Sequence, residues 1–330
     1  MTQGKPVKVL LGFTIPVFIG NVFQQFYNMV DAVVVGKFVG TKALAAVGST
    51  GTIIFLIIGF LLGLTAGFTV LTAQKYGAGK MDEMRQTVGN ALILTALISA
   101  VMTAVSMTGM HALLKFMHTP DDIFKDAYAY VMIICGGIFA QALYNILASI
   151  LRALGNSKVP LYFLILSAML NIVLDPIFIF GLHMGVRGAA LATIISQACS
   201  CIWVVSFLFG KKTFLKIQRK NMKLEARIIL PSLALGLATF IMQASESIIT
   251  VCFNSSLLKY GGDIAVGAMT ILTSVMQFAM LPLQGLGQGA QPILSYNYGA
   301  KNVDRVRGTF RLLLKVSVGY AVILWLCVEL

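Results

Sequence analysis

Apolar residues fill long stretches that recur from one end of the chain to the other, separated by short polar segments. Each stretch runs about 20 residues or more, the length that a helix needs to cross ~30 Å of hydrocarbon. Strands of a membrane barrel would be shorter and would alternate polar with apolar residues, and this chain does not alternate. The pattern predicts nine membrane-spanning helices, at 7–35, 46–74, 86–110, 125–150, 159–181, 186–209, 226–256, 264–296 and 309–330.

Charged residues are scarce. They make up 11% of the 330 residues, against 58% hydrophobic residues. Soluble domains carry about one quarter charged residues, so the composition excludes a soluble globular domain. The five cysteines fall in predicted spans without metal-ligand spacing, and His111, His118 and His183 lie in or beside outer loops. We therefore expect no cofactor or metal at these residues.

Lysine and arginine gather on one side of the predicted membrane. With the N-terminus inside, that side holds 19 of the 25 basic residues, including Lys5, Lys8 and the seven from Lys211 to Arg227. Basic residues of short loops stay on the cytoplasmic side, which predicts a multi-pass protein of the cytoplasmic (inner) membrane with a cytoplasmic N-terminus. The same bias explains the net charge of +13 without a nucleic-acid partner.

An internal repeat divides the chain. Six residues recur 222 positions later: Gly63, Gly67, Tyr76, Gly77, Asp82 and Arg85 return as Gly285, Gly289, Tyr298, Gly299, Asp304 and Arg307. Pro16 and Asp31 are likewise matched by Pro231 and Glu246. A six-helix unit thus begins again at the seventh span, which predicts an N-lobe at 1–215 with helices 1 to 6 and a partial C-lobe at 216–330 with helices 7 to 9. A full pair of such units would need about 440 residues, so we expect three helices to be missing and the chain to be a fragment or a truncated product.

Three carboxylates lie inside predicted spans: Asp31, Asp175 and Glu246. An ionisable group at the centre of a span costs at least ~2.5 kcal/mol, so each is a functional candidate. Counted along ideal helices, Asp31 lies ~35 Å above Lys8 and Asp175 lies ~22 Å above Pro160, which puts both in the outer half of the membrane. Glu246 occupies the position of Asp31 in the second repeat, and the sequence names no partner for it.

Three helices are predicted to meet at this depth. Tyr27 precedes Asp31 by four residues and Asn171 precedes Asp175 by four, so each pair shares a helical face. Thr193 reaches a similar level from the outer end of the sixth span. These five residues predict an oxygen-lined pocket whose two acids hold a proton, or in which Asp31, Asp175, Asn171 and Thr193 bind Na⁺.

Other roles for single residues remain open. Asp31 alone can be an interfacial cap, and Asp175, which precedes Pro176, can mark a helix break. Pro16 lies mid-helix below Asp31, where a bend coupled to the site is expected.

Polar amides inside the spans are candidates for lining a substrate cavity, although hydrogen bonding between helices is an equal alternative. They are Gln24, Gln25, Asn28, Gln141, Asn145, Gln197, Gln243, Gln277 and Gln284.

Four motifs together resemble a known family. They are Tyr27-Asn-Met-Val-Asp31 followed by Val35-Gly36, Arg152-Ala-Leu-Gly-Asn-Ser-Lys-Val-Pro160, Asn171-Ile-Val-Leu-Asp175-Pro176, and Gly289-Ala-Gln-Pro-Ile-Leu-Ser-Tyr-Asn-Tyr-Gly-Ala300. Across essentially the whole chain, the sequence is similar to the prokaryotic (DinF-like or NorM-like) multidrug and toxic compound extrusion (MATE) transporters. The resemblance implies a twelve-helix, two-lobe antiporter that is not an enzyme. It also implies an N-lobe ion site at the five pocket residues, and Glu246 matches an acidic C-lobe position that some members use.

The predicted function is export of cationic amphipathic drugs and toxic organic compounds, coupled to Na⁺ or H⁺, by a monomer in the lipid bilayer. One rival is a flippase for lipid-linked oligosaccharides from the same superfamily, whose anionic cargo would need basic groups in the membrane. A second rival is an inactive fragment or a structural membrane subunit. The sequence leaves the choice of ion and the identity of the substrate open.

Overall fold

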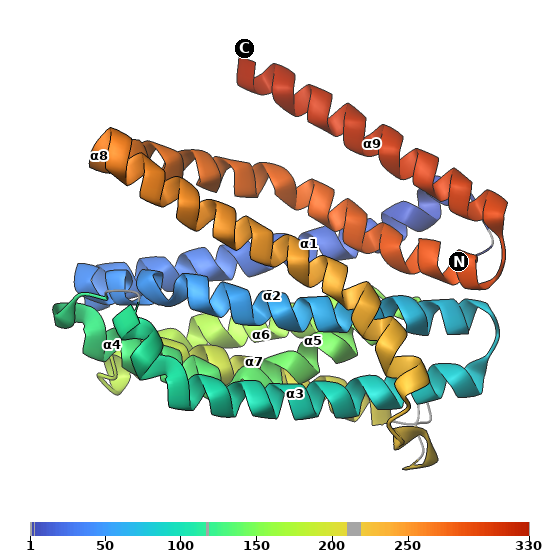
Figure 1. Cartoon of the computed structure of the whole chain (residues 1–330), viewed down its shortest axis with the longest axis horizontal. Helices are drawn as coiled ribbons and strands as arrows, with labels where there is room; N and C mark the ends of the chain where they lie inside the picture. Colours follow the sequence, from blue (N-terminus) through green and yellow to red (C-terminus); the bar gives the residue numbers. More distant parts are fainter. Residues whose placement is uncertain (1, 3, 117–118, 210–218, 330) are drawn as a thin grey trace.

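The computed structural model describes residues 2, 4–116, 119–209 and 219–329. His118 and three of the basic residues counted above, Lys211, Lys212 and Lys216, lie outside these ranges. The described residues form helices and short connections, which confirms the predicted all-α class (Figure 1). The elements are α1 (Pro6–Val34), η1 (Val35–Val39), α2 (Thr41–Gly77), α3 (Met81–Phe116), α4 (Asp121–Gly136), α5 (Ile138–Ala153), α6 (Lys158–Pro176), η2 (Ile177–Gly181), α7 (Val186–Phe209), η3 (Arg219–Met222), α8 (Ala226–Gly299) and α9 (Val303–Glu329).

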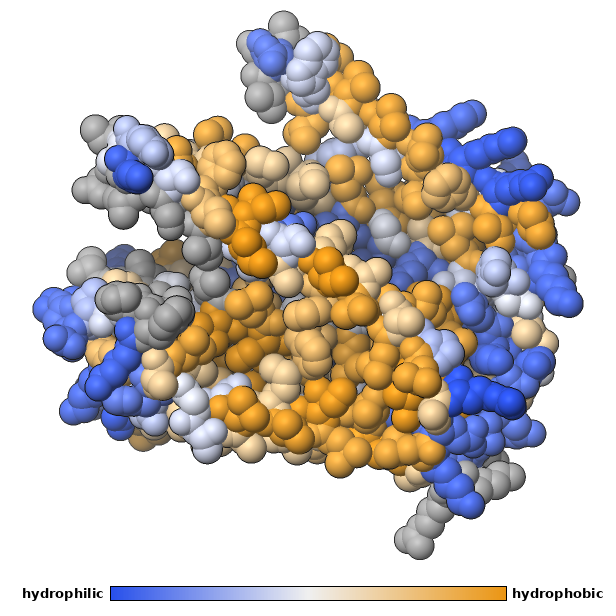
Figure 2. All heavy atoms as spheres, viewed as in Figure 1, coloured by the Kyte–Doolittle hydropathy of each residue, from blue (hydrophilic) through white to orange (hydrophobic). Residues whose placement is uncertain are grey.

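The surface carries a broad apolar band between two polar ends (Figure 2). Among the described residues, seven helices are long and apolar enough to cross a membrane, or eight if the bent pair α4 and α5 forms one span. The prediction of nine spans is therefore not met in full. The segment 264–296 is helical but is not among them. The chain is a multi-pass membrane protein.

Two glycines mark the sharp changes of direction. The expected span at 125–150 is bent by 46° at Gly137, where α4 passes into α5. A Cβ at Gly137 would lie 2.5 Å from Cγ1 of Ile194, so α7 occupies the space that a side chain would need. The two limbs of α8 join at Gly262, whose φ of 65° is a conformation that only glycine adopts without strain. The seventh and eighth predicted spans are thus joined without a loop.

The most extensive packing joins α2 to α8, and its closest approaches repeat with the sequence. A Cβ at Gly67 of α2 would lie 1.8 Å from the carbonyl oxygen of Ser232, on the first limb of α8. A Cβ at Gly289, the repeat counterpart of Gly67 on the second limb, would lie 2.7 Å from Cα of Thr14 in α1. In each repeat, the glycine at the equivalent position therefore allows close packing of a helix from the other repeat.

A second crossing of the two repeats is reciprocal. A Cβ at Gly77 would lie 1.9 Å from the carbonyl oxygen of Tyr296, and a Cβ at Gly299 would lie 1.9 Å from that of Gln74. Gly77 and Gly299 are 222 positions apart, and so are Gln74 and Tyr296. The rings of Tyr76 and Tyr296 meet edge to face beside them, with centroids 5.2 Å apart. The repeats are thus in backbone contact at the end of the bundle that also holds the N-terminus (Figure 1).

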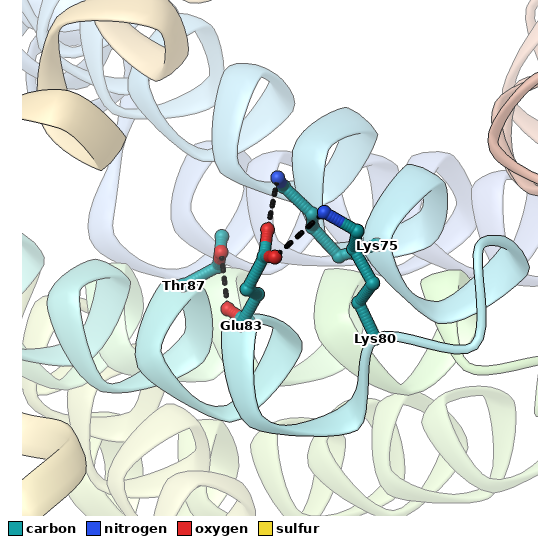
Figure 3. Close-up of polar contacts among 4 residues, drawn as sticks. All are labelled: Lys75, Lys80, Glu83 and Thr87. Carbon is teal, nitrogen blue, oxygen red and sulfur yellow. Dashed lines mark hydrogen bonds and ion pairs between the residues drawn. The ribbon is translucent and has the colours of Figure 1, made fainter.

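The short turn between α2 and α3 is held by a charged cluster. Glu83 accepts hydrogen bonds from Lys75 and from Lys80, the latter at 2.7 Å (Figure 3). The Thr87 hydroxyl donates to the backbone carbonyl of Glu83 at 2.8 Å. The cluster joins the last turn of α2 to the first turn of α3 at a polar end of the molecule.

Candidate ion site

Both helices that carry the central acids change form directly after the acid. Helix α1 passes into the π-helical turn η1 four residues beyond Asp31, and α6 passes into η2 two residues beyond Asp175. Single π-turns inside helices are frequent at functional sites. The rings of Phe38 and Phe180, one from each π-turn, meet edge to face with centroids 4.8 Å apart. The two turns therefore lie side by side.

The carboxyl groups of Asp31 and Asp175 are neighbours across the contact between α1 and α6, close enough for the charge of one to act on the other. Asp175 is 1% exposed, and no described residue donates a hydrogen bond to either of its oxygens. Oδ1 of Asp31 is also buried without a donor. Three buried carboxylate oxygens that lack donors are costly, and a proton or a small cation at the pair would remove that cost.

Asn171 and Thr193 lie together on the adjoining faces of α6 and α7. Nδ2 of Asn171 donates to Oγ1 of Thr193 at 3.4 Å, and this hydroxyl donates to the backbone carbonyl of Ala189 at 3.1 Å. Oδ1 of Asn171 is buried and accepts no hydrogen bond from a described residue. An amide oxygen without a hydrogen-bond donor is a ligand of the kind that Na⁺ prefers.

Tyrosines border the carboxyl pair. Tyr27 lies close enough to Asp31 and to the Gln197 side chain to interact with both electrostatically. Gln197, expected in the substrate cavity, thus contacts a residue of the predicted ion pocket. Tyr130 of α4 is 7% exposed and interacts with Asp31 and Tyr27, although nothing in its spacing linked it to them. The available signal was chemical, since a buried tyrosine hydroxyl usually has a polar partner.

The remaining cavity candidates are spread over three helices. Gln24 and Asn28 are exposed on α1, Gln141 and Asn145 are half-buried on α5, and Gln243 and Gln284 lie half-buried and exposed on α8. Gln25 pairs with Asn28, whose Nδ2 donates to its Oε1 at 3.4 Å, and Gln277 is exposed on α8.

The second acidic candidate and the proposed hinge lie on α8 and α1. Glu246 is exposed on the first limb of α8, and its backbone carbonyl accepts a hydrogen bond from the Thr250 hydroxyl at 2.8 Å. Pro16 is half-buried inside α1, which is helical from Pro6 to Val34.

Clusters of three or more His, Cys, Asp or Glu able to hold a metal are absent from the described residues. The predicted donor set consists instead of the carboxylates of Asp31 and Asp175, the amide oxygen of Asn171 and the hydroxyl of Thr193. Such a set suits a monovalent cation or a proton.

Comparison with known proteins places the chain in a family. The MatE family model matches residues 16–177 and 237–330. The probable multidrug resistance protein YoeA of Bacillus subtilis is 28% identical over 306 residues, which cover 91% of this chain and 66% of YoeA. The chain therefore spans about two thirds of the length of this relative.

Solved structures agree. A multidrug resistance MATE family transporter of the MOP superfamily, in an outward-facing conformation, superposes with a TM-score of 0.92 at 27% identity, over 97% of this chain and 71% of the other. A MOP superfamily transporter from Pyrococcus furiosus, described as having a binding pocket of reverse polarity, matches with the same score, identity and coverage. The family model covers more than half of the residues, and the chain belongs to the MatE family of multidrug efflux transporters.

Proposed function

We propose that this chain carries the coupling-ion site of a cation antiporter that exports cationic amphipathic drugs and toxic organic compounds. Na⁺ or H⁺ binds at Asp31 and Asp175, with Tyr27, Asn171 and Thr193 completing the site. The observation that carries the proposal is the pair of neighbouring carboxyl groups, three buried oxygens of which accept no hydrogen bond from a described residue.

The proposed coupling is electrostatic. In a low-dielectric site two ionised carboxylates repel each other and attract any nearby cation. Binding of H⁺ or Na⁺ cancels part of that charge, so the site holds a cationic substrate less strongly. Ion and substrate therefore favour different states of the protein, which is the requirement for exchange.

The proposed movement is a rocking of the two lobes, 1–215 and 216–330, about their interface. Pro16 is the proposed hinge of α1, and Glu246 is the second acidic candidate, in the C-lobe. The protein acts as a monomer in the cytoplasmic membrane with its N-terminus inside. The substrate cavity is lined by amides of α1, α5 and α8, among them Gln24, Gln141 and Gln243.

A flippase for an anionic, lipid-linked cargo is the alternative. The Pyrococcus furiosus transporter, whose pocket polarity is described as reversed, makes this a fair comparison within the superfamily. Asp31 and Asp175 supply negative charge inside the membrane, and that favours a cationic cargo here.

Purified protein in liposomes loaded with ethidium tests the proposal. Efflux is measured under an imposed pH gradient and, separately, under an imposed Na⁺ gradient. We expect one of the two gradients to drive efflux, and Asp31→Asn and Asp175→Asn to abolish it. Asp304→Asn, which changes an exposed carboxylate in the first turn of α9, is the matched control and should transport normally. Gradient-driven efflux that survives both site variants would refute the assignment.

A further inference from the structure

Asn90 of α3 is fully buried and binds the segment that leads into α8. Its Nδ2 donates to the backbone carbonyl of Lys223 at 2.9 Å, and its Oδ1 accepts from the backbone N–H of Glu225 at 2.8 Å. Nδ2 also donates to the carbonyl of Gln86 in its own helix at 2.8 Å. One side chain thus binds both a backbone carbonyl and a backbone N–H of a segment more than 130 positions away.

The neighbouring glycine makes this contact possible. A Cβ at Gly89 would lie 2.1 Å from the carbonyl oxygen of Asn221. Any side chain there would push the segment 219–225 away from α3. Gly89 and Asn90 therefore work together, one by admitting the backbone and the other by bonding it.

The first turns of α8 continue this attachment. Glu225 is the N-cap residue of α8, so Asn90 satisfies an N–H at the very start of that helix. Ile228, 8% exposed, packs in one core cluster with Val88 of α3 and Leu208 of α7. Ser232 then meets Gly67 of α2. The first helix of the predicted C-lobe begins inside the core of the predicted N-lobe.

The repeat offers an internal comparison. Asp82 and Arg85, at the start of α3, recur as Asp304 and Arg307 at the start of α9. Gly89 and Asn90 do not recur, because the corresponding positions hold Arg311 and Leu312. The Gly-Asn pair is therefore specific to the first repeat. What differs is the junction between the repeats, which contacts α3.

We propose that Asn90 is a positioning residue that fixes the start of α8 to the first lobe, so that this point stays still while the second lobe turns during transport. The inference rests on the proposed function, because only an alternating-access transporter needs such a turn. With residues 223–225 fixed on α3, the displacement of the second lobe is taken up further along α8.

Two pairs of spin labels, in a cysteine-free background in lipid nanodiscs, test this. A junction pair at Asp82 and Lys223 reports whether the start of α8 moves on α3, and an opening pair at Phe55 and Tyr260 reports the separation of the lobes. Distances are measured by pulsed electron paramagnetic resonance with saturating Na⁺, at low pH, and with ethidium. We expect the opening distance to change between these conditions while the junction distance stays constant.

Variants of Asn90 separate positioning from bulk packing. Asn90→Leu removes all three hydrogen bonds. It should broaden the distance distribution of the junction pair and merge the separate distances of the opening pair into one broad distribution. Asn90→Asp keeps the acceptor for the Glu225 N–H but loses both donated bonds. The width of its junction distance distribution should therefore lie between those of the parent protein and Asn90→Leu. Thr87→Val is the control, because this buried hydroxyl donates only within its own helix, to the carbonyl of Glu83, and both distributions should match the parent.

The possible results are distinct. A junction distance that shifts together with the opening distance in the parent protein overturns the role of Asn90 and leaves the transport proposal standing. Asn90→Leu with both distributions unchanged overturns it as well. An opening distance that does not change between any of the conditions contradicts the proposed function. The positioning role of Asn90 is then refuted as well. If Asn90→Leu does not fold, the parent measurement and Asn90→Asp decide.

Discussion

The hydroxyl of Ser157, in the turn between α5 and α6, donates a hydrogen bond to the backbone carbonyl of Gly12 in α1 at 3.3 Å. Gly12 lies four residues before Pro16, so in an unbroken helix this carbonyl would accept from the amide of residue 16. Proline has no N–H to donate. Ser157 therefore supplies the partner that Pro16 removes, and the proposed hinge of α1 is braced from a neighbouring helix.

Removing this brace should loosen α1 locally. We predict that Ser157→Ala lowers the free energy of unfolding by about 1 kcal/mol, the usual net value of one hydrogen bond. Amide hydrogen exchange should become faster in α1 around Pro16 and not elsewhere. The control is Ser206→Ala, whose exposed hydroxyl donates only to Ile202 of its own helix at 2.8 Å. Equal exchange in the two variants would show that Ser157 does not support the proline.

The glycine contact between α2 and α8 gives a second prediction. Gly67→Ala would place a methyl group 1.8 Å from the Ser232 carbonyl, so the helices must move apart. We expect a loss of about 1–3 kcal/mol in stability, as for other overpacked sites. Gly51→Ala in the same helix has open space and should be neutral or gain up to about 1 kcal/mol. Thermal unfolding in detergent compares them, and a Gly67→Ala protein as stable as Gly51→Ala would contradict the packing.

The charged turn in Figure 3 should matter little for stability. The Glu83 side chain is 42% exposed, so its bonds to Lys75 and Lys80 are weakened by solvent. We predict that Glu83→Gln costs no more than about 1 kcal/mol and that the cost shrinks in high salt. Asp82→Asn, which breaks a single 3.4 Å pair with Arg85, should cost less still. Melting curves at low and high salt measure both, and a large cost that does not depend on salt would contradict this reading.

Much of the fold could be predicted from the sequence, because membrane helices are recognised by the length and apolar composition of their segments. The acids were readable as well, since a charge inside an apolar stretch stands out. Helical spacing then aligned Tyr27 with Asp31 and Asn171 with Asp175, and in the structure the two carboxyl groups are neighbours.

Contacts between distant helices were not readable in this way. Tyr130 is one aromatic residue in an apolar span, and only the packing of α4 brings it to Asp31. Asn90 carries no spacing or motif that links it to the segment 223–225, more than 130 positions away. The kink at Gly262 depends on the backbone conformation of this one residue. The hydrophobic pattern around it gave no reason to join the seventh and eighth spans without a loop.

The central claim is that Asp31 and Asp175 together hold the coupling ion. Infrared difference spectroscopy of the purified chain tests it by following the C=O stretch of a protonated carboxyl group while pH and Na⁺ are varied. We predict a carboxyl band that disappears as the pH rises or Na⁺ is added, and that changes in frequency or in its pH dependence in both Asp31→Asn and Asp175→Asn. A band that persists unchanged in both variants, or no response to either ion in the parent protein, would contradict the account.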